Sequence, residues 1–186
     1  TTDELDIINY LDNKKDTKFR SVLHVGIGNS YFAKKFVSRF NITGITISQK
    51  EITKGKSMNL KNYQPYLIDK YSTQFKDFLD KNTFDLIIDT NLKSYTCCQE
   101  TFEFMISNIF QSINPNGMLI TSINGMKWFK DLKPKLSFSI KKFFFFKLKE
   151  INGNKNNILL PEELKKLSQK NNIKMTCDDK LCYLKK

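Results

Sequence analysis

Short apolar runs alternate along the chain with segments in which apolar residues recur every three or four positions. The runs predict strands, and the spaced segments predict helices with one buried face. Val22-Leu23-His24-Val25 is the first run, and residues 26–30 separate it from the first helical pattern. The same order then repeats. Strands are predicted over 22–25, 42–47, 66–68, 84–88 and 118–121, and helices over 31–40, from 49 onwards, over 71–81 and over 97–113.

The last part of the chain departs from this alternation. A helix is predicted over 161–172, and strands over 173–177 and 181–184 form a closing hairpin. The nearly continuous apolar run 84–88 is typical of a parallel sheet covered on both faces. We therefore expect an α/β fold, a doubly wound and mostly parallel seven-stranded sheet with a C-terminal antiparallel hairpin. We expect one domain over 1–186, with an aromatic and basic insertion at about 124–158.

The composition is typical of a soluble protein, and its charge is unevenly distributed along the chain. The 186 residues are 40% hydrophobic and carry a formal net charge of +12, but Arg20 and Arg39 are the sole arginines among 31 basic residues. Arginine is the residue favoured in phosphate and base recognition, so the lysine excess is weak support for a nucleic-acid partner. The excess lies mainly in residues 127–186, which contain 16 basic and 6 acidic residues.

Targeting and cysteine patterns favour a cytoplasmic protein. No apolar stretch approaches the roughly 18 residues of a membrane span, and the N-terminal TTDELDIINYLDN is acidic where an export signal is basic. Cys97 and Cys98 are adjacent, so they do not suit a disulfide framework. We expect all cysteines to be reduced, although Cys177 and Cys182 face each other across the hairpin. No metal site is expected, because His24 and the cysteines lack ligand spacing.

Ligands bind at the carboxyl ends of strands in an open α/β sheet, so the residues that follow each strand are the candidate site. Glycines there let backbone N–H groups approach a ligand near a helix N-terminus. Ser48 is also an N-cap candidate, with Glu51 at capping-box spacing. The candidates in chain order are Gly26, Gly28, Asn29, Ser30, Thr46, Ile47, Ser48, Ile68, Asp69, Lys70, Asp89 and Thr90.

Six segments together resemble the Rossmann-fold (class I) S-adenosylmethionine-dependent methyltransferases. The resemblance covers about residues 18–123 and 159–186. Its segments are VLHVGIGNS, ITGITIS, YLIDK, FDLIIDTN, INPNGMLITS and PEELKKLSQKNNIKMTCDDKLCYLKK.

This resemblance implies S-adenosylmethionine as the cofactor, bound by the candidate residues together with His24. It implies that Asp69 contacts the adenine, and that Gly26 and Gly28 lie against the cofactor. Asp89 is the catalytic candidate, placed to meet the methionine end or a substrate proton. The other interpretation of Asp89 is a strand-end carboxylate that caps the next turn. A methyl acceptor, either a small molecule or a nucleic acid, is implied but not identified.

Departures from the family pattern leave two alternatives. His24 and Thr46 stand where the family usually has acidic residues, and Ser30 stands at a third glycine position. One alternative is therefore a catalytically silent methyltransferase-like subunit or binding module. Another is a different transferase that uses the same pocket, such as an aminopropyl transferase. A nicotinamide enzyme is disfavoured, because its fingerprint needs glycine where Tyr31 stands and an acidic residue at Thr46.

Residues 127–150 interleave eight basic residues with Trp128, Phe129 and the run Phe143 to Phe146. In the resembled family, insertions after the fifth strand often cover the substrate, so the resemblance implies a lid over the pocket. The interleaved aromatic and basic residues also suit a surface for single-stranded nucleic acid or an anionic membrane. An equally good interpretation is an extra element whose phenylalanines pack into the core or a dimer interface.

Overall fold

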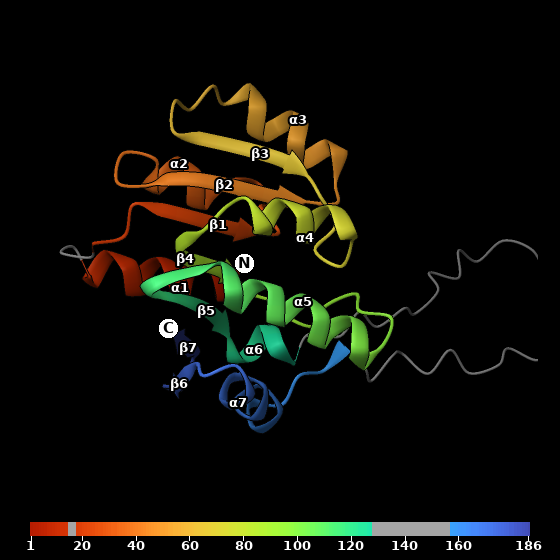
Figure 1. Cartoon of the computed structure of the whole chain (residues 1–186). Coiled ribbons are helices and arrows are strands. Elements are labelled where there is room, and N and C mark those ends of the chain that lie inside the picture. Colours follow the sequence, from red (N-terminus) through yellow and green to blue (C-terminus); the bar gives the residue numbers. More distant parts are fainter. Residues whose placement is uncertain (15–17, 128–156) are drawn as a thin grey trace, which may run out of the picture.

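Seven strands form one sheet in the computed structural model, which describes residues 1–14, 18–127 and 157–186 (Figure 1). Each short apolar run of the sequence becomes a strand, as its pattern predicts. The strands are β1 (Ser21–Val25), β2 (Asn41–Thr46), β3 (Tyr63–Leu67), β4 (Phe84–Asp89), β5 (Ile113–Ser122), β6 (Lys174–Cys177) and β7 (Leu181–Lys185).

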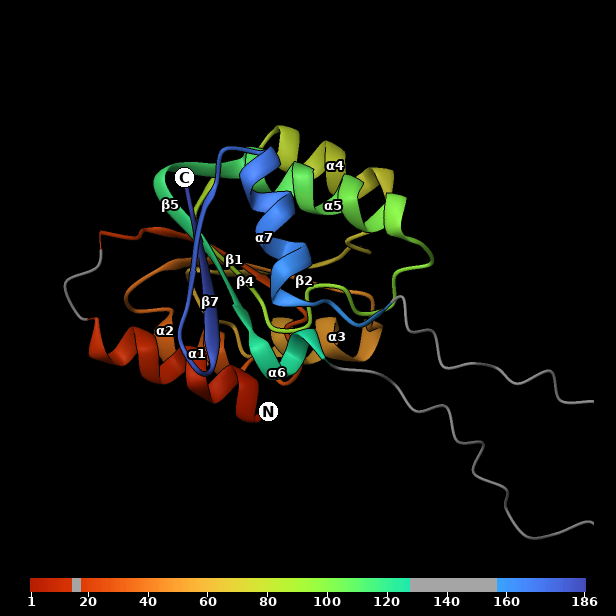
Figure 2. The same cartoon turned by 90° about the horizontal axis from the view of Figure 1, so that it is seen from below.

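Helices cover both faces of the sheet. In Figure 2, α4, α5 and α7 lie on one side of the strands, and α1, α2, α3 and α6 lie on the other. The helices are α1 (Thr2–Asn13), α2 (Tyr31–Phe36), α3 (Gln49–Ser57), α4 (Thr73–Asp80), α5 (Gln99–Ser112), α6 (Ile123–Met126) and α7 (Pro161–Lys170).

The strand order is β3-β2-β1-β4-β5-β7-β6. β1 pairs in parallel with β2 and with β4, while β7 pairs antiparallel with β5 and β6. The chain therefore builds outward from β1 in one direction and then returns to build in the other, which places the topological switch point between β1 and β4. This architecture confirms the predicted doubly wound α/β sheet with its closing antiparallel hairpin.

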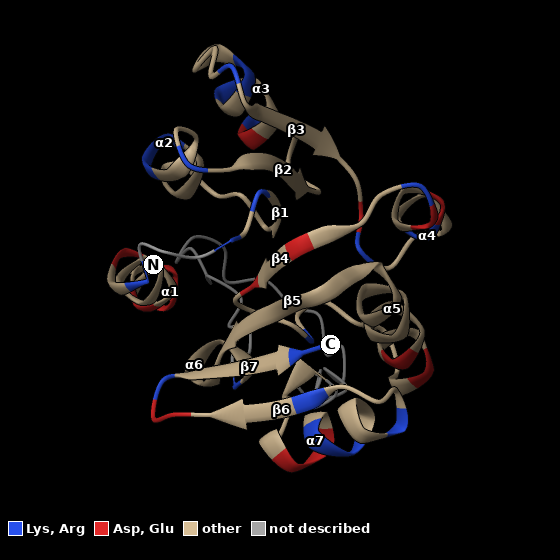
Figure 3. Cartoon of the chain, turned by 60° about the vertical axis from the view of Figure 1, so that its left-hand side comes forward, with Lys and Arg blue, Asp and Glu red and all other residues tan. Residues whose placement is uncertain are grey.

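Two apolar clusters follow from the two covered faces. One contains buried residues of α4, α5 and α7, including Phe75, Phe102 and Leu164. The other contains buried residues of α1 and α2, including Ile7 and Phe32. Strands β1, β2, β3 and β5 contain no charged residue, and the charges of Figure 3 lie mainly on helices and connections. None of the helices in the described ranges has the length and hydropathy needed to cross a lipid bilayer.

Element boundaries differ from the predicted ones where local chemistry competes with the apolar pattern. β3 begins at Tyr63 and ends at Leu67, whereas the apolar run predicts 66–68. Pro65 interrupts the pattern, but β3 is an edge strand that pairs with β2 alone, so the missing N–H leaves no ladder bond unmade. β5 extends over ten residues, whereas the apolar run predicts 118–121. The strand begins earlier because Ile113 already pairs with Phe84, ahead of the turn-forming residues Asn114–Gly117.

The expectation that all cysteines are reduced is wrong for the hairpin. Cys177 and Cys182 are direct cross-strand partners in β6 and β7, with Cα atoms 4.1 Å apart, and they form a disulfide. Antiparallel pairing brings their side chains together on one face, and the Cα separation lies just below the roughly 4.4–6.8 Å usual for a disulfide. Cys97 and Cys98 are free, as expected. The predicted insertion at about 124–158 lies largely outside the described residues, as do Trp128, Phe129 and the phenylalanine run.

Candidate functional site

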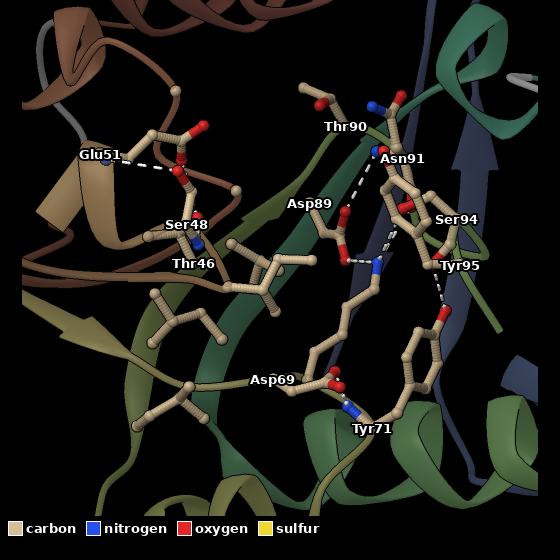
Figure 4. A pocket seen from close by; sticks show the side chains of 17 residues that line it. Thr46, Ser48, Glu51, Asp69, Tyr71, Asp89, Thr90, Asn91, Ser94 and Tyr95 are labelled. Carbon is tan, nitrogen blue, oxygen red and sulfur yellow. Dashed lines mark hydrogen bonds and ion pairs between the residues drawn. The ribbon is translucent and has the colours of Figure 1, made fainter. Parts of the chain in front are cut away.

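A pocket of about 420 Å³ opens at the carboxyl ends of β1, β2, β3 and β4. Its volume falls within the roughly 300–1,000 Å³ typical of small-molecule sites. The position is the one that the switch point between β1 and β4 predicts. Side chains from four strand ends and from the segment before α5 converge on it (Figure 4).

The turn after β1 supplies bare backbone to one wall of the pocket. Gly26 and Gly28 line it with φ angles of +77° and +51°, a region that residues with a Cβ rarely adopt. A Cβ on either glycine would project into open space, with no protein atom within 4 Å. Packing inside the protein therefore does not require glycine here. The backbone conformation does, and it leaves the turn accessible to a ligand.

A carboxylate enters the pocket from the first turn of α3. Ser48 caps this helix by accepting a hydrogen bond from the Glu51 N–H at 3.4 Å, as the capping-box spacing predicts. The Glu51 side chain does not return to the Ser48 N–H. Its Oε2 accepts a hydrogen bond of 2.7 Å from Thr46 Oγ1, and Thr46 Oγ1 accepts one from the Ser48 N–H at 3.1 Å. Figure 4 shows these three side chains together on one wall.

A buried ion pair forms the opposite wall. Lys70 Nζ lies 2.7 Å from Asp89 Oδ2, with 10% and 3% of the two side chains exposed. The ammonium also donates to the carbonyl oxygens of Asn91 and Leu92, both at 3.0 Å. The second Asp89 oxygen accepts a hydrogen bond of 3.0 Å from the Asn91 N–H. Both carboxylate oxygens of Asp89 are therefore already engaged within the protein.

Tyr71 holds the segment between β4 and α5 against this wall. Its hydroxyl donates to the Ser94 carbonyl oxygen at 2.8 Å, as Figure 4 shows. Burial, and then the nearby charge of Asp89, raise the pKa of Tyr71 well above its ordinary value. The phenol therefore stays protonated and acts as a fixed donor. Asp69 lies beside it, and its Oδ1 accepts the Tyr71 N–H at 2.9 Å.

Negative charge predominates among the described residues that line the pocket. Glu51, Asp69 and Asp89 contribute three carboxylates, and Lys70 contributes the one ammonium. The ammonium is paired with Asp89, so the Glu51 and Asp69 carboxylates are the charges left to meet a ligand. A site of this sign favours a cationic ligand and disfavours a pyrophosphate.

Most of the predicted site residues converge on this pocket. Three do not line it, for local reasons. The His24 ring packs against Phe32 under α2, with centroids 5.0 Å apart. The Ser30 hydroxyl bonds the Tyr63 hydroxyl at 2.9 Å, and the Asn29 side chain accepts the Tyr31 N–H at 3.0 Å. The predicted residues that do line it are Gly26, Gly28, Thr46, Ile47, Ser48, Ile68, Asp69, Lys70, Asp89 and Thr90.

Several pocket residues escape a search of strand ends. Glu51 stands five residues after β2, and its capping-box spacing signalled a helix start, not a pocket carboxylate. Tyr71 stands next to the predicted Asp69 and Lys70, while Ser94 enters from a loop that carries no strand signal. The sequence offers no periodic pattern that would place a loop of this kind, since its position depends on the Lys70 and Tyr71 contacts.

Comparison with known proteins finds similarity in structure alone. No family model and no curated protein matches the sequence. The N-methyltransferase NodS from Bradyrhizobium japonicum WM9 superposes with a TM-score of 0.63 at 12% identity, covering 100% of this chain and 96% of NodS. Its complex with S-adenosyl-L-homocysteine gives 0.59 at 13% identity, covering 90% and 78%.

Two further structures are larger than this chain. An O-methyltransferase family protein from Burkholderia thailandensis gives a TM-score of 0.63 at 12% identity, covering 96% of this chain and 55% of that protein. The amino pentose methyltransferase CalS10 from Micromonospora echinaspora, with S-adenosylmethionine bound, gives 0.50 at 15% identity, covering 64% and 49%. This chain thus spans about half the length of both. It has the fold of the Rossmann-like (class I) S-adenosylmethionine-dependent methyltransferases.

Proposed function

We propose that this chain binds S-adenosylmethionine in the pocket and transfers its methyl group to an acceptor. The observation that carries the proposal is the carboxylate-rich pocket at the switch point, with a positive-φ glycine turn on one wall. A sulfonium and an amino group are cationic, so a pocket in which carboxylates outnumber ammonium groups complements them. The fold shared with NodS, whose structure holds S-adenosyl-L-homocysteine, supports the same ligand.

The residues present fit such a ligand. The glycine turn leaves room for the ligand backbone, and Ile47 and Ile68 offer apolar contacts to a flat base between β2 and β3. Asp69 keeps its Oδ2 for a base amino group or a hydroxyl, since the Tyr71 N–H bonds Oδ1. When bound, S-adenosylmethionine would supply the electrophilic methyl group. The chain's own part is to position two reactants and to exclude water.

Glu51 is the residue that we assign to the ribose hydroxyls. Thr46 stands where the resembled family usually has an acidic residue. This replacement is one reason why the sequence leaves a catalytically silent subunit as an alternative. The Thr46 hydroxyl donates to Glu51, so a carboxylate from α3 lies beside the strand end after all. A carboxylate accepts two hydroxyl hydrogen bonds with charge assistance, which a threonine alone does not. This placement weakens the argument for the silent subunit from Thr46.

In this proposal Asp89 positions the pocket wall through its ion pair with Lys70 and does not act as a base. Its carboxylate is paired with Lys70 and bonded by the Asn91 N–H, so it holds the pocket wall in place. No dedicated base is needed when the acceptor loses its proton to solvent after methylation. The acceptor enters from the side of Tyr95, whose side chain is 56% exposed at the pocket.

Calorimetric titration with S-adenosylmethionine, S-adenosyl-L-homocysteine and NAD tests the cofactor. We expect the first two to bind and NAD not to bind. The Glu51→Gln variant should weaken S-adenosyl-L-homocysteine binding about 10- to 150-fold, because it loses one charge-assisted hydrogen bond of roughly 1.5–3 kcal/mol. Glu162→Gln, an exposed carboxylate on α7, is the matched control and should leave the affinity unchanged.

Transfer is tested separately with methyl-labelled S-adenosylmethionine and fractionated small molecules and nucleic acids. Label that passes to an acceptor with the wild-type chain, and not with Asp69→Asn, supports a methyltransferase. Binding without transfer in any fraction would favour a silent binding subunit. If neither adenosyl ligand binds, the proposed function is wrong.

A further inference from the structure

Two thiols touch at the start of α5, outside the residues that line the pocket. Cys97 Sγ lies 3.6 Å from Cys98 Sγ. The Thr101 hydroxyl lies 3.3 Å from the first sulfur and 3.2 Å from the second. Both cysteines are free, Cys97 is exposed and Cys98 is partly exposed. A solute can therefore reach two sulfur atoms at once.

The sulfur spacing fits a bridging atom better than a direct bond. A disulfide needs the sulfurs at about 2.05 Å, well short of the 3.6 Å found here. A tetrahedral centre with two sulfur bonds of about 2.3 Å holds its sulfurs roughly 3.8 Å apart. A soft centre would thus enter between the two sulfurs with little movement of the chain.

The surroundings also favour the thiolate form of Cys97, and the thiolate is the form that binds soft ions. Hydrogen bonds with the Thr101 hydroxyl, and then with the Cys98 thiol, lower the pKa of Cys97 below its ordinary value. The sulfur spacing does not depend on this lowered pKa.

We propose that Cys97 and Cys98 form a two-thiolate site for a thiophilic centre, a soft metal ion or a trivalent arsenical, that bonds both sulfurs. With an organoarsenic oxide, two arsenic–sulfur bonds form, and the oxygen leaves as water with the two thiol protons. No oxidation state changes, so no oxidant is required. With a divalent soft ion, the two thiol protons pass to solvent.

Mass spectrometry of the full chain with phenylarsine oxide tests this site. The protein is kept free of reductant, so that Cys177 and Cys182 stay in their disulfide. A reagent that reacts with one thiol at a time should first detect two free thiols per chain. We then expect one phenylarsenic group per chain and the loss of both titratable thiols. A parallel titration with Cd²⁺ shows whether a metal ion binds the same pair, and phenylarsine oxide should displace it.

Single-thiol variants decide the result. Cys97→Ser and Cys98→Ser should each lose the phenylarsenic group, because one sulfur cannot close the bridge. A Cys177→Ser/Cys182→Ser variant, the matched control, should keep it. The proposal is overturned if neither probe binds the wild-type chain, if either single variant keeps the adduct, or if Cys97 and Cys98 prove already joined to each other.

Discussion

His24 shows how strongly one buried residue responds to its surroundings. The side chain is 2% exposed, and its Nδ1 is buried without a hydrogen-bond partner among the described residues. Burial alone lowers the pKa of His24 from 6.5 to about 4. The imidazole is therefore neutral at pH 7, and it supports the contact with Phe32 as an apolar ring. It is a core residue that lies outside the residues lining the pocket.

This burial predicts a pH-dependent stability. The folded-state pKa lies below the unfolded one, so the contribution of His24 is present in full above pH 6.5 and is lost as the pH falls toward 4. The loss amounts to about 3 kcal/mol at most. Urea unfolding of the wild-type chain and of His24→Leu, which cannot be protonated, measures it. The difference between the two free energies should change between pH 6.5 and 4, and a constant difference would contradict the prediction.

Single residues were the hardest part to predict from the sequence. Strand ends could be located from apolar runs, which gave ten of the pocket residues, including Asp69 and Asp89. The role of each depended on contacts that no local pattern encodes. Asp89 forms an ion pair with Lys70, which lies 19 positions away in the sequence, and Thr46 donates a hydrogen bond to the Glu51 carboxylate. The Cys177 pairing needed the register of the hairpin, which is fixed only once both strands pair.

At the scale of elements, Lys70 links the end of β3 to the segment between β4 and α5. Its ammonium bonds Asp89, and it also bonds the carbonyl oxygens of Asn91 and Leu92. Lys70→Met removes the cation and leaves the Asp89 carboxylate buried with its charge uncompensated. We expect the free energy of unfolding to fall by about 3–5 kcal/mol, the cost of breaking a buried pair from one side.

A double variant separates the pair from the side chain. Lys70→Met/Asp89→Leu removes both charges, so most of the lost stability should return, because no uncompensated charge stays buried. Urea unfolding followed by circular dichroism gives both values. A single variant that loses less than about 1 kcal/mol would mean that solvent already screens Asp89, contrary to its burial.

The order and type of elements were predictable, because each depends on patterns within about a dozen residues. Apolar periodicity identified α2, α3, α4 and α5, and Pro161 with Glu162 marked the start of α7, whereas α1 and the short α6 were not among the predicted helices. Boundaries were less predictable where pairing overrides the pattern. β3 begins before Pro65 because it lies at the edge of the sheet, and edge position is a property of the whole topology.

For the whole molecule, α1 joins the two ends of the chain. Its Asp3 accepts a hydrogen bond from Ser122 at the end of β5, and its Asp6 pairs with Lys180 before β7. The Tyr10 ring lies 4.8 Å from that of Tyr183. On the same helix, Ile7, Ile8 and Leu11 are buried in the apolar cluster on this face of the sheet. The N-terminal helix is therefore part of the core and not an appendage.

Leu11→Ala tests whether this core is one unit. The side chain is fully buried, so its truncation should lower the free energy of unfolding by about 2–5 kcal/mol. Both apolar clusters pack on the same strands, so loss of one uncovers the sheet that supports the other. We expect a single, earlier transition when urea unfolding is followed by helix and by strand signals alike. Leu5→Ala, on the exposed side of α1, should change little. Separate transitions for the two signals would show instead that α1 unfolds alone, leaving the sheet and the pocket in place.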